Sequence, residues 1–262
     1  MLALIFSVGI VVYLRLVTQL ASTGGQVKTD GLDLPDLLVS FVLLSAFGGL
    51  AFHAIMSGDA SAEPAKPDHA LQNSAVFVGI AAGVVALLYA RGLRPGTLFG
   101  LSRIGPVRAL GWALLLLLAA FPFIMLVNYI TTKLLKEDAV RQPMVEFFRN
   151  AAERHDYAAM SSVGVAAIIV APVCEEFFFR GYFYGVGKRY FGAWTSGALT
   201  ALMFAAIHAN LASLPGLFVL AVALTLAYEG TGSLLVPMGM HALFNATSLS
   251  VLYAQGTGIL KP

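Results

Sequence analysis

The sequence predicts an all-α, polytopic membrane protein with about eight transmembrane helices. Of its 262 residues, 58% are hydrophobic and only 11% are charged, whereas about 25% of the residues of a soluble domain are charged. The mean hydropathy is +0.82. The apolar residues are also concentrated in long runs, which is typical of membrane spans rather than of a soluble core.

Eight apolar segments follow one another along the chain. Several approach the roughly 20 residues that a helix needs to cross a hydrocarbon core, and the sixth and seventh are shorter. Transmembrane strands are excluded, because the runs are far longer than about 10 residues and do not alternate. The segments are residues 2–21, 37–56, 75–90, 109–130, 159–184, 194–207, 214–228 and 234–253.

The longest polar connection, residues 133–157, contains apolar residues at regular intervals. Met144, Phe147, Phe148 and Ala151 recur at near-helical spacing. This spacing indicates a short amphipathic helix that lies in the membrane interface, or equally a solvated helix within a loop.

Ionisable side chains inside the apolar segments are few. A charge at membrane depth costs about 2.5–3.5 kcal/mol on insertion scales, so such residues usually face the bundle interior and mark function. We expect Arg15 to snorkel or to pair inside the bundle, and Glu229 to lie at the membrane interface. The ionisable residues of these segments are Arg15, His53, Glu175, Glu176, Arg180, His208, Glu229 and His241.

Spacing relates these groups to one another. Glu176 and Arg180 are four residues apart, which makes them neighbours on a helix and predicts an ion pair. Glu175 points about 100° away and has no partner on its own helix. His241 and Asn245 share a face of the eighth segment, and His208 ends the sixth. Three segments therefore present polar groups that can meet.

Three short motifs contain these residues. Glu175–Arg180 reads "EEFFFR", Phe204–His208 reads "FAAIH" and His241–Asn245 reads "HALFN". In this order the motifs resemble those of the CPBP family of intramembrane metalloproteases, the CAAX prenyl protease and bacteriocin-processing (Abi) proteins. The resemblance covers about residues 159–253. We therefore expect residues 1–158 to form N-terminal helices and loops with four spans, and 159–253 to form a CAAX protease-like catalytic core with four spans.

The resemblance implies hydrolysis of a peptide bond at an active site within the membrane. Glu175 is the candidate general base that activates water, and His208 would orient this water. His241 and Asn245 would stabilise the oxyanion, and Glu176 with Arg180 would lock the helix, although Glu176 could also act directly. Glu175, His208 and His241 are also the candidate ligands of a divalent metal such as Zn²⁺. The compact zinc motif His-Glu-x-x-His is absent, so the sequence leaves the need for a metal open.

We expect the substrate to be a membrane-embedded or membrane-associated peptide or protein. The other expected partner is the lipid bilayer, and no nucleic acid is expected. The protein would be an integral, multi-pass protein of a bacterial inner membrane. The alternative is a non-catalytic membrane scaffold or immunity protein of the same family. An ion-coupled transporter would also place Glu and His in a bundle, but it would more often show two similar halves, which are not seen here.

Overall fold

Every apolar segment of the sequence forms a helix in the computed structural model, which describes residues 2–57, 67–135 and 143–260. Among these residues no strand occurs. The helices are α1 (Leu2–Thr23), α2 (Leu34–Ser57), α3 (Pro67–Ala90), α4 (Pro95–Leu98), α5 (Pro106–Leu135), α6 (Pro143–Glu153), a long helix over Tyr157–Phe191, α10 (Ala193–Ala206), α11 (Leu214–Thr231) and α12 (Leu235–Gly256).

The long helix is a composite of α-helical and π-helical stretches. In order, it contains α7 (Tyr157–Val165), the π-helical η3 (Ala166–Val170), α8 (Ala171–Glu176), the π-helical η4 (Phe177–Phe183) and α9 (Tyr184–Phe191). It ends at Gly192, whose φ of 80° is easily reached only by glycine, and α10 begins immediately afterwards.

Seven helices in the described part of the chain are long and apolar enough to cross a membrane. The fold is therefore an all-α, multi-pass membrane protein, as the sequence predicts. The eighth expected span, α10, is apolar but shorter. Large hydrophobic side chains lie on the outer surface, for example Phe41 with 69% and Leu38 with 59% exposure, as a helix that faces lipid requires.

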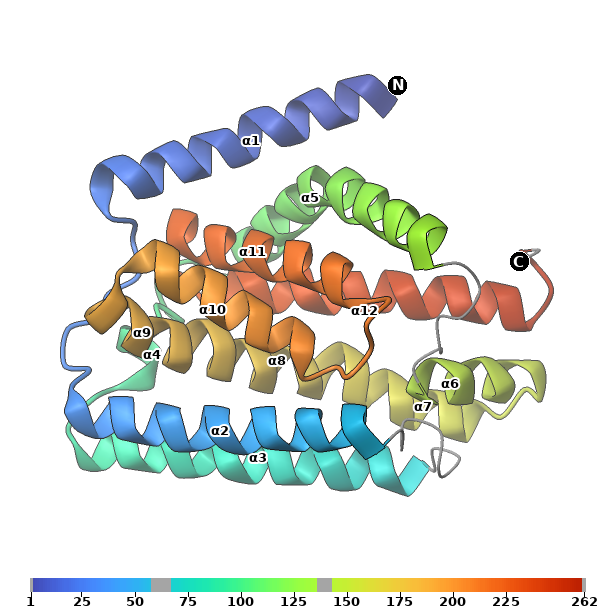
Figure 1. Cartoon of the computed structure of the whole chain (residues 1–262), viewed down its shortest axis with the longest axis horizontal. Helices are drawn as coiled ribbons and strands as arrows, with labels where there is room; N and C mark the ends of the chain where they lie inside the picture. Colours follow the sequence, from blue (N-terminus) through green and yellow to red (C-terminus); the bar gives the residue numbers. More distant parts are fainter. Residues whose placement is uncertain (1, 58–66, 136–142, 261–262) are drawn as a thin grey trace.

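Most of the helices lie roughly along one direction, and α5 is bent and runs across it (Figure 1). Helices α2 and α3 run along one flank, and α1 lies on the opposite flank, where it packs on α5 and α11. The long helix, α10, α11 and α12 lie between these flanks. A core of aromatic residues surrounds η4, and a second core of small and branched residues joins α5, α11 and α12. The central helices are thereby shielded on both sides.

The amphipathic pattern in residues 133–157 does form a helix, α6. Its Phe148 and Ala151 are buried, and α6 packs on α12 and α7. The apolar face is thus turned toward protein, and the position of α6 relative to the membrane stays a prediction. The side chain of Met144 lies outside the described residues.

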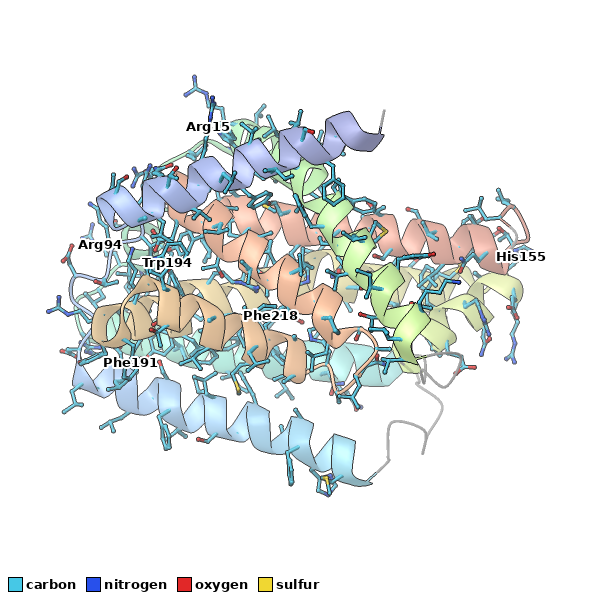
Figure 2. All side chains as sticks on the ribbon, turned by 45° about the horizontal axis from the view of Figure 1, so that its top comes forward. Arg15, Arg94, His155, Phe191, Trp194 and Phe218 are labelled. Atoms are coloured by element: carbon cyan, nitrogen blue, oxygen red, sulfur yellow. The ribbon has the colours of Figure 1, made fainter. Side chains whose placement is uncertain are left out.

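Two charged residues of the apolar segments differ in their surroundings. Arg15 is exposed and points away from the bundle (Figure 2), as a snorkelling arginine does. Glu229, near the end of α11, is packed within the protein with only 1% exposure, and its position at the membrane interface stays a prediction. Its Oε1 accepts hydrogen bonds from the hydroxyl of Tyr184 (2.5 Å) and from Nζ of Lys188 (2.6 Å), and its Oε2 accepts one from the N–H of Val27 (3.1 Å). These bonds fasten the α1–α2 loop to α9 and α11.

Candidate active site

Both predicted acidic residues lie in the middle of the long helix. Asp156 caps the first turn of this helix, since its Oδ1 accepts a hydrogen bond of 3.0 Å from the N–H of Ala159. Glu175 and Glu176 end the short α8, with a π-helical stretch on either side of it. π-helical turns occur often at functional sites. They shift the direction in which the following side chains leave the helix, so regular helical geometry alone does not give the direction of these side chains.

Glu176 is the centre of a fully buried polar cluster. Its Oε1 accepts a hydrogen bond of 2.8 Å from Nη1 of Arg180, one turn further along the helix. The same Oε1 lies 2.9 Å from Nδ1 of His241 on α12. The ion pair expected from the four-residue spacing is present, and it also holds an imidazole of another helix.

Glu175 lies on the other side of the same imidazole. Its Oε2 is 4.0 Å from Nε2 of His241, too far for a direct hydrogen bond, and is buried without a partner among the described residues. A carboxylate only accepts hydrogen bonds, so Nδ1 of His241 carries the proton that Glu176 accepts. In the neutral ring Nε2 then keeps its lone pair. Two acceptors, Oε2 of Glu175 and Nε2 of the neutral His241, then face each other. A molecule with two hydrogen-bond donors, placed between them, would bond to both.

His208 reaches the cluster through a shared neighbour, Phe204. Its Nδ1 is 2.7 Å from the carbonyl oxygen of Phe204, which can only accept, so Nδ1 carries a proton, and in the neutral ring Nε2 has a lone pair. The Phe204 ring lies 5.0 Å from the ring of His208 and 5.6 Å from that of His241, and the Arg180 guanidinium stacks on it at 4.4 Å. Within the described residues, no hydrogen bond or ion pair joins His208 directly to Glu175 or His241.

Asn245 shares a face of α12 with His241, as the spacing predicts. Its Nδ2 donates a hydrogen bond of 2.7 Å to the carbonyl oxygen of Ala167 in η3. This bond ties α12 to the long helix about two turns before the acids. The amide carries a second N–H donor.

The three candidate metal ligands are only partly brought together. Glu175 and His241 approach each other, but across the described residues no group of three or more His, Cys, Asp or Glu side chains is arranged to hold a metal ion. A catalytic zinc site usually has three protein ligands. This arrangement does not fit such a site, and metal dependence stays a prediction.

A cavity of about 210 Å³ reaches Glu175 from the side of α3. Glu175 is the only charged side chain among its lining residues. About 10–15 Å³ of such space suffices for one water molecule, so the cavity can admit several waters or part of a ligand. The lining residues are Asn73, Ser74 and Phe77 of α3, and Val163, Ala166, Ala167, Val170, Ala171 and Glu175 of the long helix.

The contribution of α3 to this cavity does not follow from the sequence. Asn73 and Phe77 lie in one of the first four spans, whose sequences show only that they are apolar. Polar residues such as Asn73 and Ser74 are common near the start of a span, so no local signal marks these positions as part of a site. Only the packing of α3 against α7, η3 and α8 brings them opposite Glu175.

A comparison with protein families supports the resemblance. Residues 158–247 match the family described as Type II CAAX prenyl endopeptidase Rce1-like. No curated protein and no solved structure matched the chain. The matched region contains every candidate site residue from Glu175 to Asn245. The resemblance drawn from the three motifs is thereby confirmed for this part of the chain, since residues 158–247 are similar to the Rce1-like type II CAAX prenyl endopeptidase family.

Proposed function

We propose that the protein is an intramembrane endopeptidase that hydrolyses a peptide bond of a membrane-associated protein or peptide. The observation that supports this most directly is the pair of facing acceptors, Glu175 Oε2 and His241 Nε2, 4.0 Å apart beside a cavity. A water molecule between them would donate one hydrogen to each and keep its lone pairs for attack. Two hydrogen bonds of about 2.8 Å from one water span roughly 4.4 Å, so a shift of a few tenths of an ångström admits it.

In this proposal Glu175 is the general base. It takes one proton from the water as the water oxygen bonds to the carbonyl carbon of the substrate, and the other hydrogen stays on the water oxygen, bonded to His241. The carbonyl oxygen becomes negative, and the second N–H of Asn245 is the donor that would stabilise it. When the C–N bond breaks, Glu175 returns the proton to the leaving amine.

The tautomer of His241 changes the role expected for it. With its proton on Nδ1, His241 accepts a hydrogen bond from water rather than donating one to an oxyanion. Glu176 holds this tautomer and the ring orientation, and Arg180 compensates the charge of Glu176. We assign to His208 the same task as to His241, which is to accept a hydrogen bond from the attacking water through Nε2.

The buried unpaired oxygens favour catalysis over a scaffold. Oε2 of Glu175 and Oε2 of Glu176 are buried without hydrogen-bond partners within the described residues. Each such atom costs about 1–3 kcal/mol of folding free energy. A protein that only bound a partner would have no need for this cost, whereas a general base must keep one oxygen open to water.

Cleavage by purified variants tests the proposal. The wild type and Glu175→Gln, His208→Ala and His241→Ala would be incubated in detergent with a peptide library, and products identified by mass spectrometry. We expect cleavage by the wild type and a loss of about 10²–10⁴-fold in each variant. The melting temperature should stay close to that of the wild type for Glu175→Gln and His208→Ala, and should fall for His241→Ala, because the buried His241 bonds to Glu176. If all three variants cut like the wild type, the assignment is wrong. A wild type that cuts none of the peptides but binds them as well as Glu175→Gln does would support the scaffold.

A further inference from the structure

We propose that the cavity between α3 and the long helix receives a large apolar side chain, of about the size of leucine or phenylalanine, from the substrate residue next to the cleaved bond. The inference rests on the proposed function and adds the part of the substrate that the site recognises. It depends on three features of the cavity: the row of residues that leads to Glu175, the opposite wall and the volume between them.

The first feature is a row of small side chains on the long helix. Val163, Ala167 and Ala171 precede Glu175 at intervals of four residues, and all four line the cavity. Because all four line the same cavity, the row forms one continuous strip, although Ala167 lies in the π-helical η3. The strip is apolar until it reaches the carboxylate. A side chain that lies along it therefore brings its own peptide bonds close to Glu175.

The second feature is a fixed opposite wall. Phe77 of α3 stacks on Phe47 at 5.6 Å and meets the edge of Phe178 at 6.2 Å. Phe47 and Phe178 are buried. The ring of Phe77 is thus held by the aromatic core, and the width of the cavity is set before any substrate binds. Asn73, one turn earlier and exposed, supplies an amide that can bond to the substrate backbone.

The third feature is the size of the space. Its volume of about 210 Å³ exceeds the roughly 150 Å³ of an apolar protein cavity that accepts benzene. A leucine or phenylalanine side chain therefore fits, whereas alanine leaves most of the space unfilled. Each missing methylene in a hydrophobic pocket lowers kcat/KM by about 10-fold or more. The cavity should thus select large apolar residues.

Matched peptides and one filling substitution test this inference. The peptides differ only in the residue on one side of the cleaved bond, which is alanine, leucine or phenylalanine, and a second series varies the other side. In one series, the wild type should cut the leucine and phenylalanine peptides at least about 10-fold faster than the alanine peptide. Ala167→Leu fills the middle of the strip and should bring this ratio close to one. The control Val165→Leu, on the exposed outer side of the same helix, should keep the wild-type ratio.

The outcomes distinguish a substrate pocket from a space that serves only packing. A wild type without side-chain preference in either series would overturn the inference. The inference would also be overturned if Ala167→Leu left the ratio of the leucine and alanine cleavage rates unchanged, or slowed the cleavage of all peptides equally. An unchanged ratio with a raised melting temperature would identify the cavity as a packing void or a lipid site, and would overturn the inference too. Phe77→Leu provides a second variant where Ala167→Leu does not fold, and it should shift the preference from leucine toward phenylalanine.

Binding separates this inference from the proposed function. The affinities of the same labelled peptides are measured by fluorescence anisotropy with Glu175→Gln, alone and combined with Ala167→Leu. Tighter binding of the leucine peptide than of the alanine peptide, abolished by Ala167→Leu, supports the cavity even where the wild type cuts nothing. If hydrolysis depends on Glu175 but its rate is the same for all peptides, the proposed role of the cavity is wrong and the proposed function stands.

Discussion

Nδ1 of His241 lies 2.9 Å from Oε1 of Glu176, which joins α12 to the helix that carries both acids. Because the same oxygen accepts a hydrogen bond from Arg180, one buried carboxylate positions groups from two helices. Glu175 remains on the opposite side of the imidazole, next to the cavity. In the proposed reaction, neighbouring acids therefore have different tasks, one in positioning and one in proton transfer.

The positioning task of Glu176 can be tested by Glu176→Gln. The amide keeps the shape of the side chain but removes the charge that favours a proton on Nδ1 of His241. We expect kcat to fall by about 10–100-fold with little change in KM, as for other partners that orient a catalytic imidazole. Steady-state kinetics with a cleaved peptide measures both constants. A variant with wild-type kcat would show that Glu176 does not orient His241 for the reaction.

The polar cluster around Glu229 gives a prediction on stability alone. Tyr184→Phe removes the hydroxyl that donates to Glu229 at 2.5 Å and should lower the free energy of unfolding by about 1.5–3 kcal/mol. Tyr190→Phe is the matched control on the same helix, because Tyr190 is 42% exposed and its substitution should change stability by less than about 0.5 kcal/mol. Equal stabilities of the two variants, measured by unfolding in detergent, would contradict the role of this bond.

A second cluster, at the start of α2 and just after α3, predicts how stability depends on pH. Arg91 forms ion pairs with Asp36 and, at 2.6 Å, with Asp33. The hydrogen bond to Asp36 raises the pKa of the Arg91 guanidinium above its ordinary value. Because the folded-state pKa is raised, Arg91 contributes fully to the free energy of unfolding at every pH below its unfolded-state pKa. This contribution is lost only as the pH rises through the higher folded-state pKa.

Arg91→Met should therefore destabilise the protein by the same amount at every pH from about 7.5 to about 9.5, well below the ordinary pKa of arginine. The expected loss is about 1.5–3 kcal/mol, because a hydrogen bond to a charged group is removed. Unfolding of the wild type and the variant across this pH range gives the difference, and Arg94→Met, at an exposed position (Figure 2), is the control. A difference that shrinks as pH rises within this range would contradict the assignment.

Metal removal tests the open question of a divalent ion. Glu175 and His241 provide two donors, and within the described residues His208 does not complete a three-ligand group. We therefore expect cleavage to persist after treatment with a strong chelator, with the inactive Glu175→Gln as the baseline. Loss of cleavage with chelator and its recovery with zinc would instead mean that the three residues rearrange around a metal.

The membrane fold could be predicted from the sequence because it depends on local properties. Long apolar runs must form helices in lipid, where every backbone N–H needs an internal partner. The Glu176–Arg180 pair was predictable for the same reason, since four residues make about one helical turn. Both features need no knowledge of which helices are neighbours.

The remaining features depend on packing between distant segments. Glu229 is buried against Val27, which lies 202 residues away in the sequence, so no local pattern could reveal its burial. His241 was expected to meet the unpaired Glu175, whereas its closer contact is to Glu176. The π-helical stretches on both sides of α8 could not be predicted either, because helical periodicity assumes a regular backbone.

The rate of peptide cleavage by Glu175→Gln tests the central claim most directly. The measurement is single-turnover cleavage by the wild type and by the variant, on a peptide that the wild type cuts, with equal melting temperatures as proof of intact folding. If Glu175 is the general base, the rate should fall by at least about 10²-fold. Cleavage by the folded variant at the wild-type rate would contradict the claim.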